Sequence, residues 1–266
     1  MAGVRLAATV ILARRPFEVY LTRRSGRSVF APDAFVFPGG TIEAQDASVQ
    51  ARARTLALDD ERLEREFRAE THARLPSEEP PIDRDAAAAL LVAALRELFE
   101  EAGVLLARGA DGRPIDAGAT DWGTVADERL AVRQGKLAFA AFLHAHDWYA
   151  DSGALALFSH WITPPSEPRR YNTHFFFASA PAGQVPLADA IETHDGVWIA
   201  PATALARYNA GELHLVYPTI KHLARLASFD SVDAAFAYAR EKRVLTIVPN
   251  EIAGGFEIPP AIEGAW

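Results

Sequence analysis

Three glutamates recur on one side of a predicted helix. The segment RELFEEAGV, residues 96–104, ends a long alanine- and leucine-rich stretch that predicts a helix. Glu97, Glu100 and Glu101 are three and four residues apart, so their carboxylates share one stripe and repel by about 0.2–0.5 kcal/mol per pair. The negative end of the helix dipole disfavours them further. A hard divalent cation such as Mg²⁺ or Mn²⁺ would explain the arrangement, because it prefers clustered carboxylate oxygens. The alternative interpretation is a solvated acidic face.

A glycine turn earlier in the chain favours a cation site over a solvated acidic face. The segment FPGG, residues 37–40, stops a short apolar run. Gly39 and Gly40 have no side chains, so their backbone carbonyls can lie close to a metal ion or a ligand.

The two segments together resemble a Nudix box, whose pattern is G-x5-E-x7-R-E-U-x-E-E-x-G-U, with U a bulky apolar residue. Gly40 matches the first glycine, and residues 96–104 match the second half position by position. Two departures stand out: Asp46 replaces the first glutamate of the box, and residues 47–95 replace its usual seven-residue spacer. The resemblance implies a box that is interrupted by an insertion and reunited in space.

A box split in this way is similar to the peroxisomal coenzyme A diphosphatase branch of the Nudix family and its bacterial relatives. Residues 20–25 (YLTRRS), 160–164 (HWITP), 169–178 (RRYNTHFFFA) and 196–205 (GVWIAPATAL) also resemble that branch, so the likeness runs from about residue 6 to residue 226. It implies a hydrolase that cleaves the pyrophosphate bond of a nucleoside diphosphate linked to another group. Within that branch, the resemblance makes coenzyme A or an acyl-coenzyme A the expected substrate. NADH, ADP-ribose and a nucleotide sugar remain alternatives.

A rival from another class is a noncatalytic Nudix-type ligand sensor. Sensors of this kind keep the fold and lose acidic residues of the box, whereas all three helix glutamates are present here. The retained glutamates therefore favour an enzyme.

The resemblance also implies roles for the residues of the box. Glu97, Glu100 and Glu101 are expected to bind the metal, with Glu97 and Glu101 the stronger choices, and the carbonyls of Gly39 and Gly40 to complete the coordination. Arg96 is expected to orient a neighbouring carboxylate.

The general base has two sources in the family, the box helix and a later loop. Glu192 lies on such a loop before a predicted strand and is a candidate for the base, with a plain surface acid as the alternative.

An anionic substrate also needs positive charge, and arginine suits phosphate because its planar fork donates two hydrogen bonds. Arg23, Arg24, Arg169 and Arg170 lie on or beside predicted strands near the glycine turn and are expected to bind substrate; each is also consistent with a solvated charge. Other residues carry weaker expectations. The histidines at 160, 174 and 194 lack ligand spacing and are expected to be structural, and the aromatic residues at 161, 171 and 175 either stack on an adenine or belong to the core.

The helices and strands that position these residues are predicted from the spacing of apolar residues and from the capping, glycine and proline residues between them. A helix is expected from a cap at Asp83 or Asp85 to Gly103, with the leucines of residues 91–98 packed inward and the glutamates on a separate stripe. Residues 47–83 predict a helical insertion on the surface, because Leu56, Leu63 and Phe67 recur at helical spacing. Strands are expected at 6–13, 17–22, 35–37, 169–180, 195–200, 243–249 and 255–259, and helices at 125–146, 201–208, 218–226 and 231–242. These elements predict an α/β protein, a Nudix-type α/β/α sandwich with a mixed β-sheet and a helical insertion, as a single domain over residues 1–266 with additional C-terminal elements at 228–266.

Composition limits the class of protein further. The chain has 266 residues, a net charge of -8 and no cysteine, which excludes disulfides and thiolate metal sites and argues against nonspecific nucleic-acid binding. No segment approaches the ~20 apolar residues of a membrane span. We therefore expect a cytoplasmic protein that binds a small nucleotide substrate, with no nucleic-acid or membrane partner; a homodimer remains open.

Overall fold

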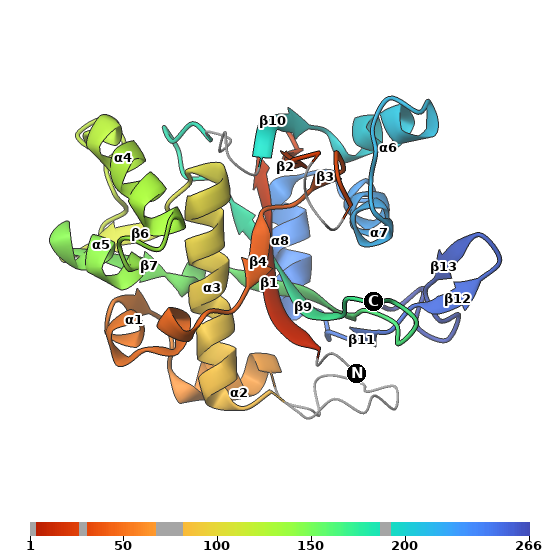
Figure 1. Ribbon diagram of the computed structural model, residues 1–266, viewed down its shortest axis with the longest axis horizontal. Helices are drawn as coiled ribbons and strands as arrows, with labels where there is room; N and C mark the ends of the chain where they lie inside the picture. The colour runs from red at the N-terminus through yellow and green to blue at the C-terminus, as the bar shows by residue number, and fades with distance from the viewer. Residues whose placement is uncertain (1–3, 27–30, 68–81, 187–192) are drawn as a thin grey trace.

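The computed structural model describes residues 4–26, 31–67, 82–186 and 193–266, and a mixed β-sheet runs through its centre (Figure 1). Its strands follow the order β10-β2-β1-β9-β8-β11, with β3 paired to β2 and β4 paired to β1. The pairs β1–β9 and β8–β11 are parallel and the others are antiparallel. The strands are β1 (Arg5–Arg14), β2 (Glu18–Arg24), β3 (Phe35–Val36), β4 (Gly39–Thr41), β8 (Ala156–Ile162), β9 (Tyr171–Ser179), β10 (Thr193–Ile199) and β11 (Thr246–Ile247).

Helices cover both faces of this sheet. Alternate residues of β1 face opposite sides: Val10 and Leu12 pack with the α3 side, and Ile11 and Ala13 with the α7 and α8 side. The helices are α1 (Val49–Ala53), α2 (Asp60–Phe67), α3 (Arg84–Ala102), α4 (Trp122–Arg133), α5 (Phe139–Ala145), α6 (Pro201–Asn209), α7 (Tyr217–Leu226) and α8 (Val232–Glu241). The predicted α/β/α sandwich with a mixed sheet is confirmed.

Helix α3 begins and ends where its capping residues predict. The Asp83 side chain accepts a hydrogen bond from the Ala86 amide at 2.8 Å, and Gly103 adopts the left-handed conformation with φ 68°. The leucine face packs inward as expected, and the glutamate stripe is buried as well, because every residue from Ala87 to Ala102 is buried. The sheet covers one side of α3, and the elements drawn to its left in Figure 1 cover the other.

The described part of the insertion is mainly helical, as expected, but its apolar side chains pack into the core. Leu56 lies in the strand β5 (Thr55–Leu56), which pairs with β7 (Trp148–Asp151) in a small sheet with β6 (Ala107–Gly109). Leu63 and Phe67 on α2 are only 4% and 6% exposed, and the Phe67 ring lies 6.3 Å from the Phe176 ring of the central sheet. Periodicity was right for α2, but it extended the helix across a strand and did not reveal the burial. The remainder of the expected insertion, residues 68–81, lies outside the described residues.

The C-terminal elements complete the face of the sheet opposite α3. Helix α8, capped by Ser231, packs Val232 and Ala235 into this core, and the strands β12 (Asn250–Ile252) and β13 (Gly255–Glu257) form a hairpin. Trp161 and Phe175, weighed as adenine-stacking residues, are buried here, with ring centres 5.5 and 4.2 Å from that of His222.

His160 and His174 lie inside the protein. His160 contacts Thr246 and Asn172 at 2.9 and 2.5 Å, and its ring stacks on that of His174 at 4.1 Å. Both positions agree with the structural role expected for these residues.

Lys242 is a buried cation that should oppose folding at neutral pH. Its Nζ lies 4.9 and 5.0 Å from the ring centres of Phe158 and Tyr238 and has no hydrogen-bond partner in the described chain. Burial and, to a smaller extent, the charge of Arg225 together lower the pKa of Lys242 to about 7. Because the unfolded chain holds this proton up to about pH 10, stability rises with pH between the two pKa values.

We therefore expect Lys242→Met to raise the free energy of unfolding by about 1–3 kcal/mol at neutral pH and by much less near pH 10. Urea unfolding at the two pH values measures the effect, with Lys136→Met on the surface as the matched control. Equal or lower stability of Lys242→Met at neutral pH would show that the buried ammonium is well compensated.

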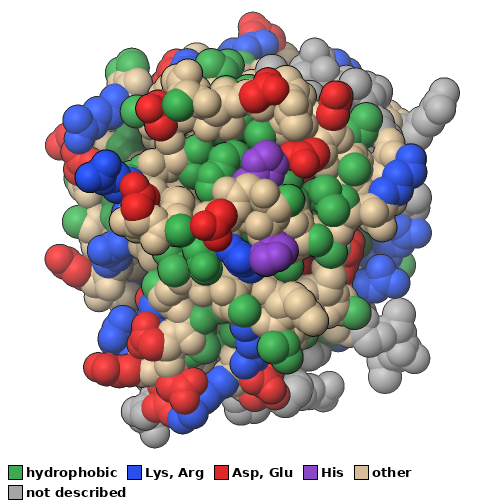
Figure 2. All heavy atoms as spheres, turned by 90° about the vertical axis from the view of Figure 1, so that its left-hand side faces the viewer, with side chains coloured by type: hydrophobic (Ala, Val, Ile, Leu, Met, Phe, Trp, Pro, Cys, Tyr) green, Lys and Arg blue, Asp and Glu red, His purple; other side chains and the backbone are tan. Residues whose placement is uncertain are grey.

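The surface turned to the viewer in Figure 2, formed by the elements on the left of Figure 1, carries acidic and basic side chains interspersed with apolar ones. None of the helices in the described ranges combines the length and the apolar character needed to cross a bilayer.

Candidate active site

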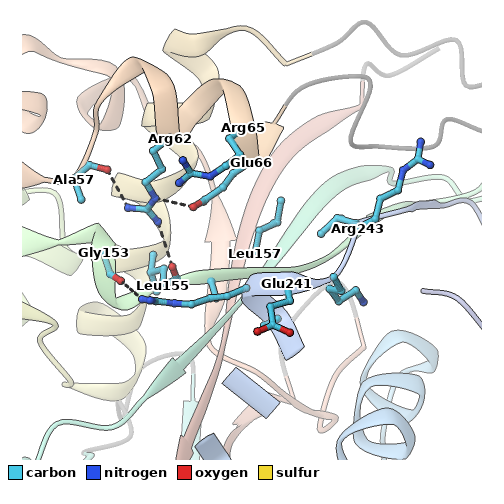
Figure 3. Close-up of a pocket in the computed structure, with 14 residues that line it drawn as sticks. Ala57, Arg62, Arg65, Glu66, Gly153, Leu155, Leu157, Glu241 and Arg243 are labelled. Carbon is cyan, nitrogen blue, oxygen red and sulfur yellow. Dashed lines mark hydrogen bonds and ion pairs between the residues drawn. The ribbon is translucent and has the colours of Figure 1, made fainter. Parts of the chain in front are cut away.

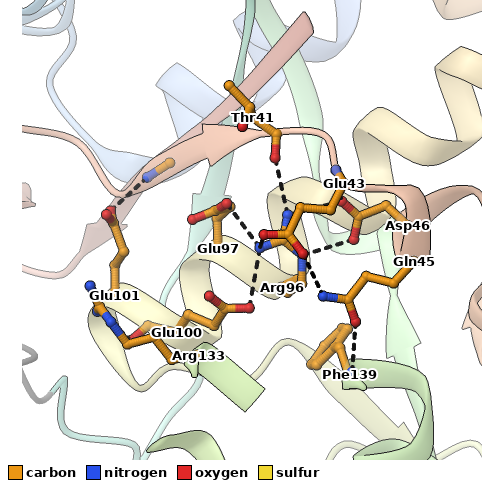
Figure 4. A network of polar contacts seen from close by, with 11 residues as sticks. Thr41, Glu43, Gln45, Asp46, Arg96, Glu97, Glu100, Glu101, Arg133 and Phe139 are labelled. Atoms are coloured by element: carbon orange, nitrogen blue, oxygen red, sulfur yellow. Dashed lines mark hydrogen bonds and ion pairs between the residues drawn. The ribbon is translucent and has the colours of Figure 1, made fainter. Parts of the chain in front are cut away.

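Strand β4 and helix α3 bring the two predicted half-sites into contact. The Gly39 amide donates a hydrogen bond to Glu101 Oε2 at 2.8 Å, and the Thr41 carbonyl accepts one from Arg96 at 3.1 Å (Figure 4). Between them, a Cβ atom added at Gly40 would lie only 2.3 Å from Glu97 Oε1. Segments separated by residues 47–95 therefore form one site.

A buried arginine organises the carboxylates of this site. Arg96 is fully buried, and its Nε and one terminal nitrogen donate to both oxygens of Asp46 at 2.8 and 2.9 Å. The other terminal nitrogen donates to Glu97 at 2.9 Å and to Glu100 at 3.1 Å. Asp46 also accepts from the Glu43 amide at 2.8 Å, so the shorter acid at this box position still uses both oxygens.

One guanidinium does not neutralise the carboxylates around it. Glu97, Glu100 and Glu101 are 9%, 8% and 9% exposed. Burial, together with the charges of Glu101 and Glu100, raises the pKa of Glu97 to about 8 against the opposing effect of Arg96. Burial likewise raises the pKa of Glu100, against Arg96. A nearby cation would reverse both shifts, because it stabilises the ionised carboxylates.

The donor atoms suit a hard divalent cation. Glu97, Glu100 and Glu101 offer carboxylate oxygens on about one turn of α3, next to the peptide groups of Gly39 and Gly40. In the part of the chain that the structure describes, no three acidic or histidine side chains converge on one point. The reason is visible in Figure 4: Arg96 holds Glu97 and Glu100, and the Gly39 amide holds Glu101. An ion would be held through the remaining oxygens or after these side chains turn.

The close approach at Gly40 gives a direct test of this geometry. A methyl group at Gly40 would collide with the Glu97 carboxylate, so Gly40→Ala should displace Glu97 and lower kcat by about tenfold or more. Gly255→Ala is the matched control, since a Cβ there meets no atom within 4 Å. Steady-state kinetics of the two variants measure kcat, and their melting temperatures show whether the fold is intact. Unchanged kcat in Gly40→Ala would mean that the position of Glu97 does not matter for turnover.

The predicted substrate-binding arginines are not placed alike. Alternation along β2 puts Arg24 on the same face as Tyr20, which packs on the α3 side, and Arg23 on the other, where it pairs with Asp33 at 3.0 Å. Arg170 donates to the Thr163 carbonyl at 3.0 Å and lies immediately before the first residue of β9.

The register of the strands shows how far Arg169 and Arg170 lie from the site. The Arg170 carbonyl bonds to Arg5, whereas Gly40 pairs with Ala8, so about 10 Å of strand separates them. Arg169 precedes Arg170 in the turn before β9. Of these arginines, the structure brings Arg24 to the face on which α3 lies. Glu192 lies outside the described residues.

Two residues near the site were not expected. Burial raises the pKa of the Tyr20 phenol to about 12, with the charge of Arg129 opposing the rise and that of Glu101 adding to it. Arg129 also lines a cavity of about 260 Å³ between α3 and α4, with Phe99, Trp122, Val125 and Ala126 among its walls. Tyr20 could have been predicted, because it lies on the same face of its strand as Arg24. Arg129 could not, because a single arginine in an expected helix gives no functional signal.

Comparison with known proteins identifies relatives that carry Nudix or diphosphatase names. The family model described as NUDT19 Nudix domain matches residues 1–226. Acyl-coenzyme A diphosphatase NUDT19 of Gallus gallus is 27% identical over 91% of this chain and 71% of its own length. The protein of that name from Homo sapiens is 27% identical over 81% of this chain and 62% of its own length, so the chain spans roughly two thirds of these relatives. The crystal structure of a NUDIX hydrolase from Alicyclobacillus acidocaldarius has 28% identity and a TM-score of 0.67, and the match covers 89% of this chain and 97% of that chain.

Proposed function

Since this chain belongs to the Nudix family, through its NUDT19-type domain over residues 1–226, we propose that it is a divalent-metal-dependent diphosphatase that cleaves the pyrophosphate bond of coenzyme A or an acyl-coenzyme A. One observation carries the proposal above all: the glycine turn and the glutamate-bearing helix, far apart in sequence, meet through the Gly39–Glu101 hydrogen bond and the contact of Gly40 with Glu97. The coenzyme A substrate rests on the names of the curated relatives.

Each residue of the site has a proposed task. Glu97, Glu100 and Glu101 hold Mg²⁺ or Mn²⁺ with help from the carbonyl of Gly40. A bound divalent cation supplies neutralisation of the diphosphate charge and acidifies a water molecule. Arg96 fixes the carboxylates through its bonds to Glu97, Glu100 and Asp46 and does not touch the substrate.

Proton transfer and charge recognition use the remaining groups. The base that accepts the proton of the attacking water comes from the box helix or from Glu192. Arg24, on the face shared with Tyr20, is the strongest of the proposed phosphate-binding arginines, ahead of Arg23 and Arg170.

The cavity between α3 and α4 is the proposed place for the pantetheine arm. It lies beside the helix that carries Glu100 and Glu101, and its walls are mainly apolar apart from Arg129 and Gln184. We expect Ala126→Trp to fill it and to lower kcat/KM for coenzyme A about tenfold, with little change for ADP-ribose, which lacks this arm. Parallel kinetics on both substrates check the selectivity. Equal losses of kcat/KM on both substrates would show that the pantetheine arm does not bind in this cavity.

The direct experiment is incubation of the purified protein with Mg²⁺ and a panel of coenzyme A, acetyl-coenzyme A, NADH, ADP-ribose and a nucleotide sugar, followed by separation of the products. The expected products from coenzyme A are 3',5'-ADP and phosphopantetheine, formed faster than any product from the other compounds. Preferred cleavage of another compound would overturn the assignment of coenzyme A as the substrate. No turnover of any compound in the panel would favour a noncatalytic sensor.

A further inference from the structure

A second cavity, of about 790 Å³, opens on the side of the molecule where the insertion meets the C-terminal elements (Figure 3). Its walls come from α2, from the segment that leads into β8, and from the end of α8 with the residues that follow it. Arg84, the first residue of α3, pairs with Asp60 of α2 at 2.9 Å, whereas Glu97 lies thirteen residues further, about 20 Å along the helix axis. This cavity is therefore separate from the carboxylate site.

The lining of the cavity is cationic in a chain of net charge -8. Five of its side chains are basic and two are acidic; the basic ones are Arg62, Arg65, Arg240, Lys242 and Arg243. Of the acids, Glu66 is already paired with Arg62 at 2.8 Å. The positive charge of the cavity is therefore not balanced by its own walls.

The exposed guanidinium groups have donors to spare. Arg65 is exposed and makes no hydrogen bond or ion pair with any other residue that the structure describes. Arg240 gives one hydrogen bond, to the Gly153 carbonyl at 3.0 Å, and lies over the Phe236 ring. Each guanidinium carries five N–H donors, so most of those on Arg65 and Arg240 remain available to a ligand.

The frame that holds these charges is rigid. Arg62 is buried and donates to the Ser152 hydroxyl and carbonyl at 2.9 Å, to the Ala57 carbonyl at 2.9 Å and to the Leu155 carbonyl at 3.2 Å. These bonds tie α2 to the segment before β8. In Figure 3, Arg65 and Glu66 reach toward the cavity from α2, while Glu241 and Arg243 come from the opposite wall.

We propose that this cavity binds a phosphorylated small molecule, held between Arg65 of the insertion and Arg240 of α8. The planar fork of arginine matches phosphate oxygens, and the volume falls in the range of small-molecule sites, about 300–1,000 Å³. The ligand would bridge two segments that both pack around the Nudix core. The insertion thus supplies a wall of a second site, a role that goes beyond the diphosphatase activity.

Pyrophosphate is the probe, titrated into the full chain by isothermal calorimetry with excess EDTA, which withdraws divalent cations from the glutamates. The wild type should bind one pyrophosphate, with an affinity that falls as salt is raised. Arg65→Glu and Arg240→Glu should each weaken binding about tenfold, since each replaces attraction by repulsion. Arg113→Glu, at a side chain that is 86% exposed and outside this cavity, and Glu101→Gln should leave binding unchanged.

Three results would overturn the proposal. One is the absence of saturable binding by the wild type. Another is unchanged affinity in Arg65→Glu and Arg240→Glu variants whose melting temperatures match the wild type. The third is a changed affinity in Glu101→Gln alone, which would assign the probe to the carboxylate site and leave the proposed diphosphatase activity standing.

Discussion

Replacing Glu101 with glutamine is expected to lower kcat for coenzyme A cleavage by roughly 10²–10³-fold while leaving the fold intact. Glutamine has the same size, and its carbonyl oxygen can still accept the hydrogen bond from the Gly39 amide that Glu101 accepts at 2.8 Å. What the substitution removes is the negative charge, on which cation binding depends. Steady-state kinetics at saturating Mg²⁺ measure the loss, and the melting temperature reports on the fold.

Glu251→Gln is the control for this substitution, because Glu251 lies exposed on β12. It should keep full activity. If Glu101→Gln also kept full activity at an unchanged melting temperature, the proposed metal site on α3 would be wrong.

Removal of Arg96 should have the largest effect on stability. Arg96→Met leaves Asp46, Glu97 and Glu100 buried without their shared cation, and breaking a buried pair in this way costs about 3–5 kcal/mol. Activity should fall as well, since the carboxylates lose the group that orients them.

The pH dependence of this loss has a definite sign. Burial already raises the pKa of Glu97 to about 8, and Arg96 opposes that rise. The folded state therefore binds more protons than the unfolded state between the ordinary glutamate pKa and about 8, and its stability falls as pH rises through this window. Without Arg96 the pKa rises further, so the destabilisation should be larger near pH 8 than near pH 5.

Urea unfolding in EDTA at these two pH values tests both statements. Arg113→Met, at an exposed position, should change the stability by less than about 0.5 kcal/mol. A loss in Arg96→Met no larger than this, or one that shrinks as pH rises, would contradict the view that Arg96 compensates buried carboxylates.

Local signals in the sequence predicted the helix that carries the site. Asp83 and Gly103 set the ends of α3 through capping and a left-handed conformation, both of which depend on neighbouring residues alone. The contact between Gly40 and Glu97 was predicted from the pattern of the box, in spite of the long insertion between them.

Features that depend on tertiary packing were not predictable in this way. Burial of the glutamates results from elements packed on both sides of α3, and Leu56 belongs to a strand because β7 pairs with it. Spacing gave Arg23 and Arg24 equal standing, but the direction in which each points depends on the register of β2 in the sheet. Arg129 approaches the site only because α4 packs against α3.

Binding of Mn²⁺ is the most direct measurement of the central claim, that the glycine turn and the three glutamates jointly hold a divalent ion. Electron paramagnetic resonance of free Mn²⁺ during titration gives the affinity of the wild type and of the Glu97→Gln, Glu101→Gln and Glu251→Gln variants without any substrate. We expect saturable binding by the wild type and by Glu251→Gln, and affinities at least about tenfold weaker in the other two. Equal Mn²⁺ affinity in all four proteins, or no binding by the wild type, would contradict the claim.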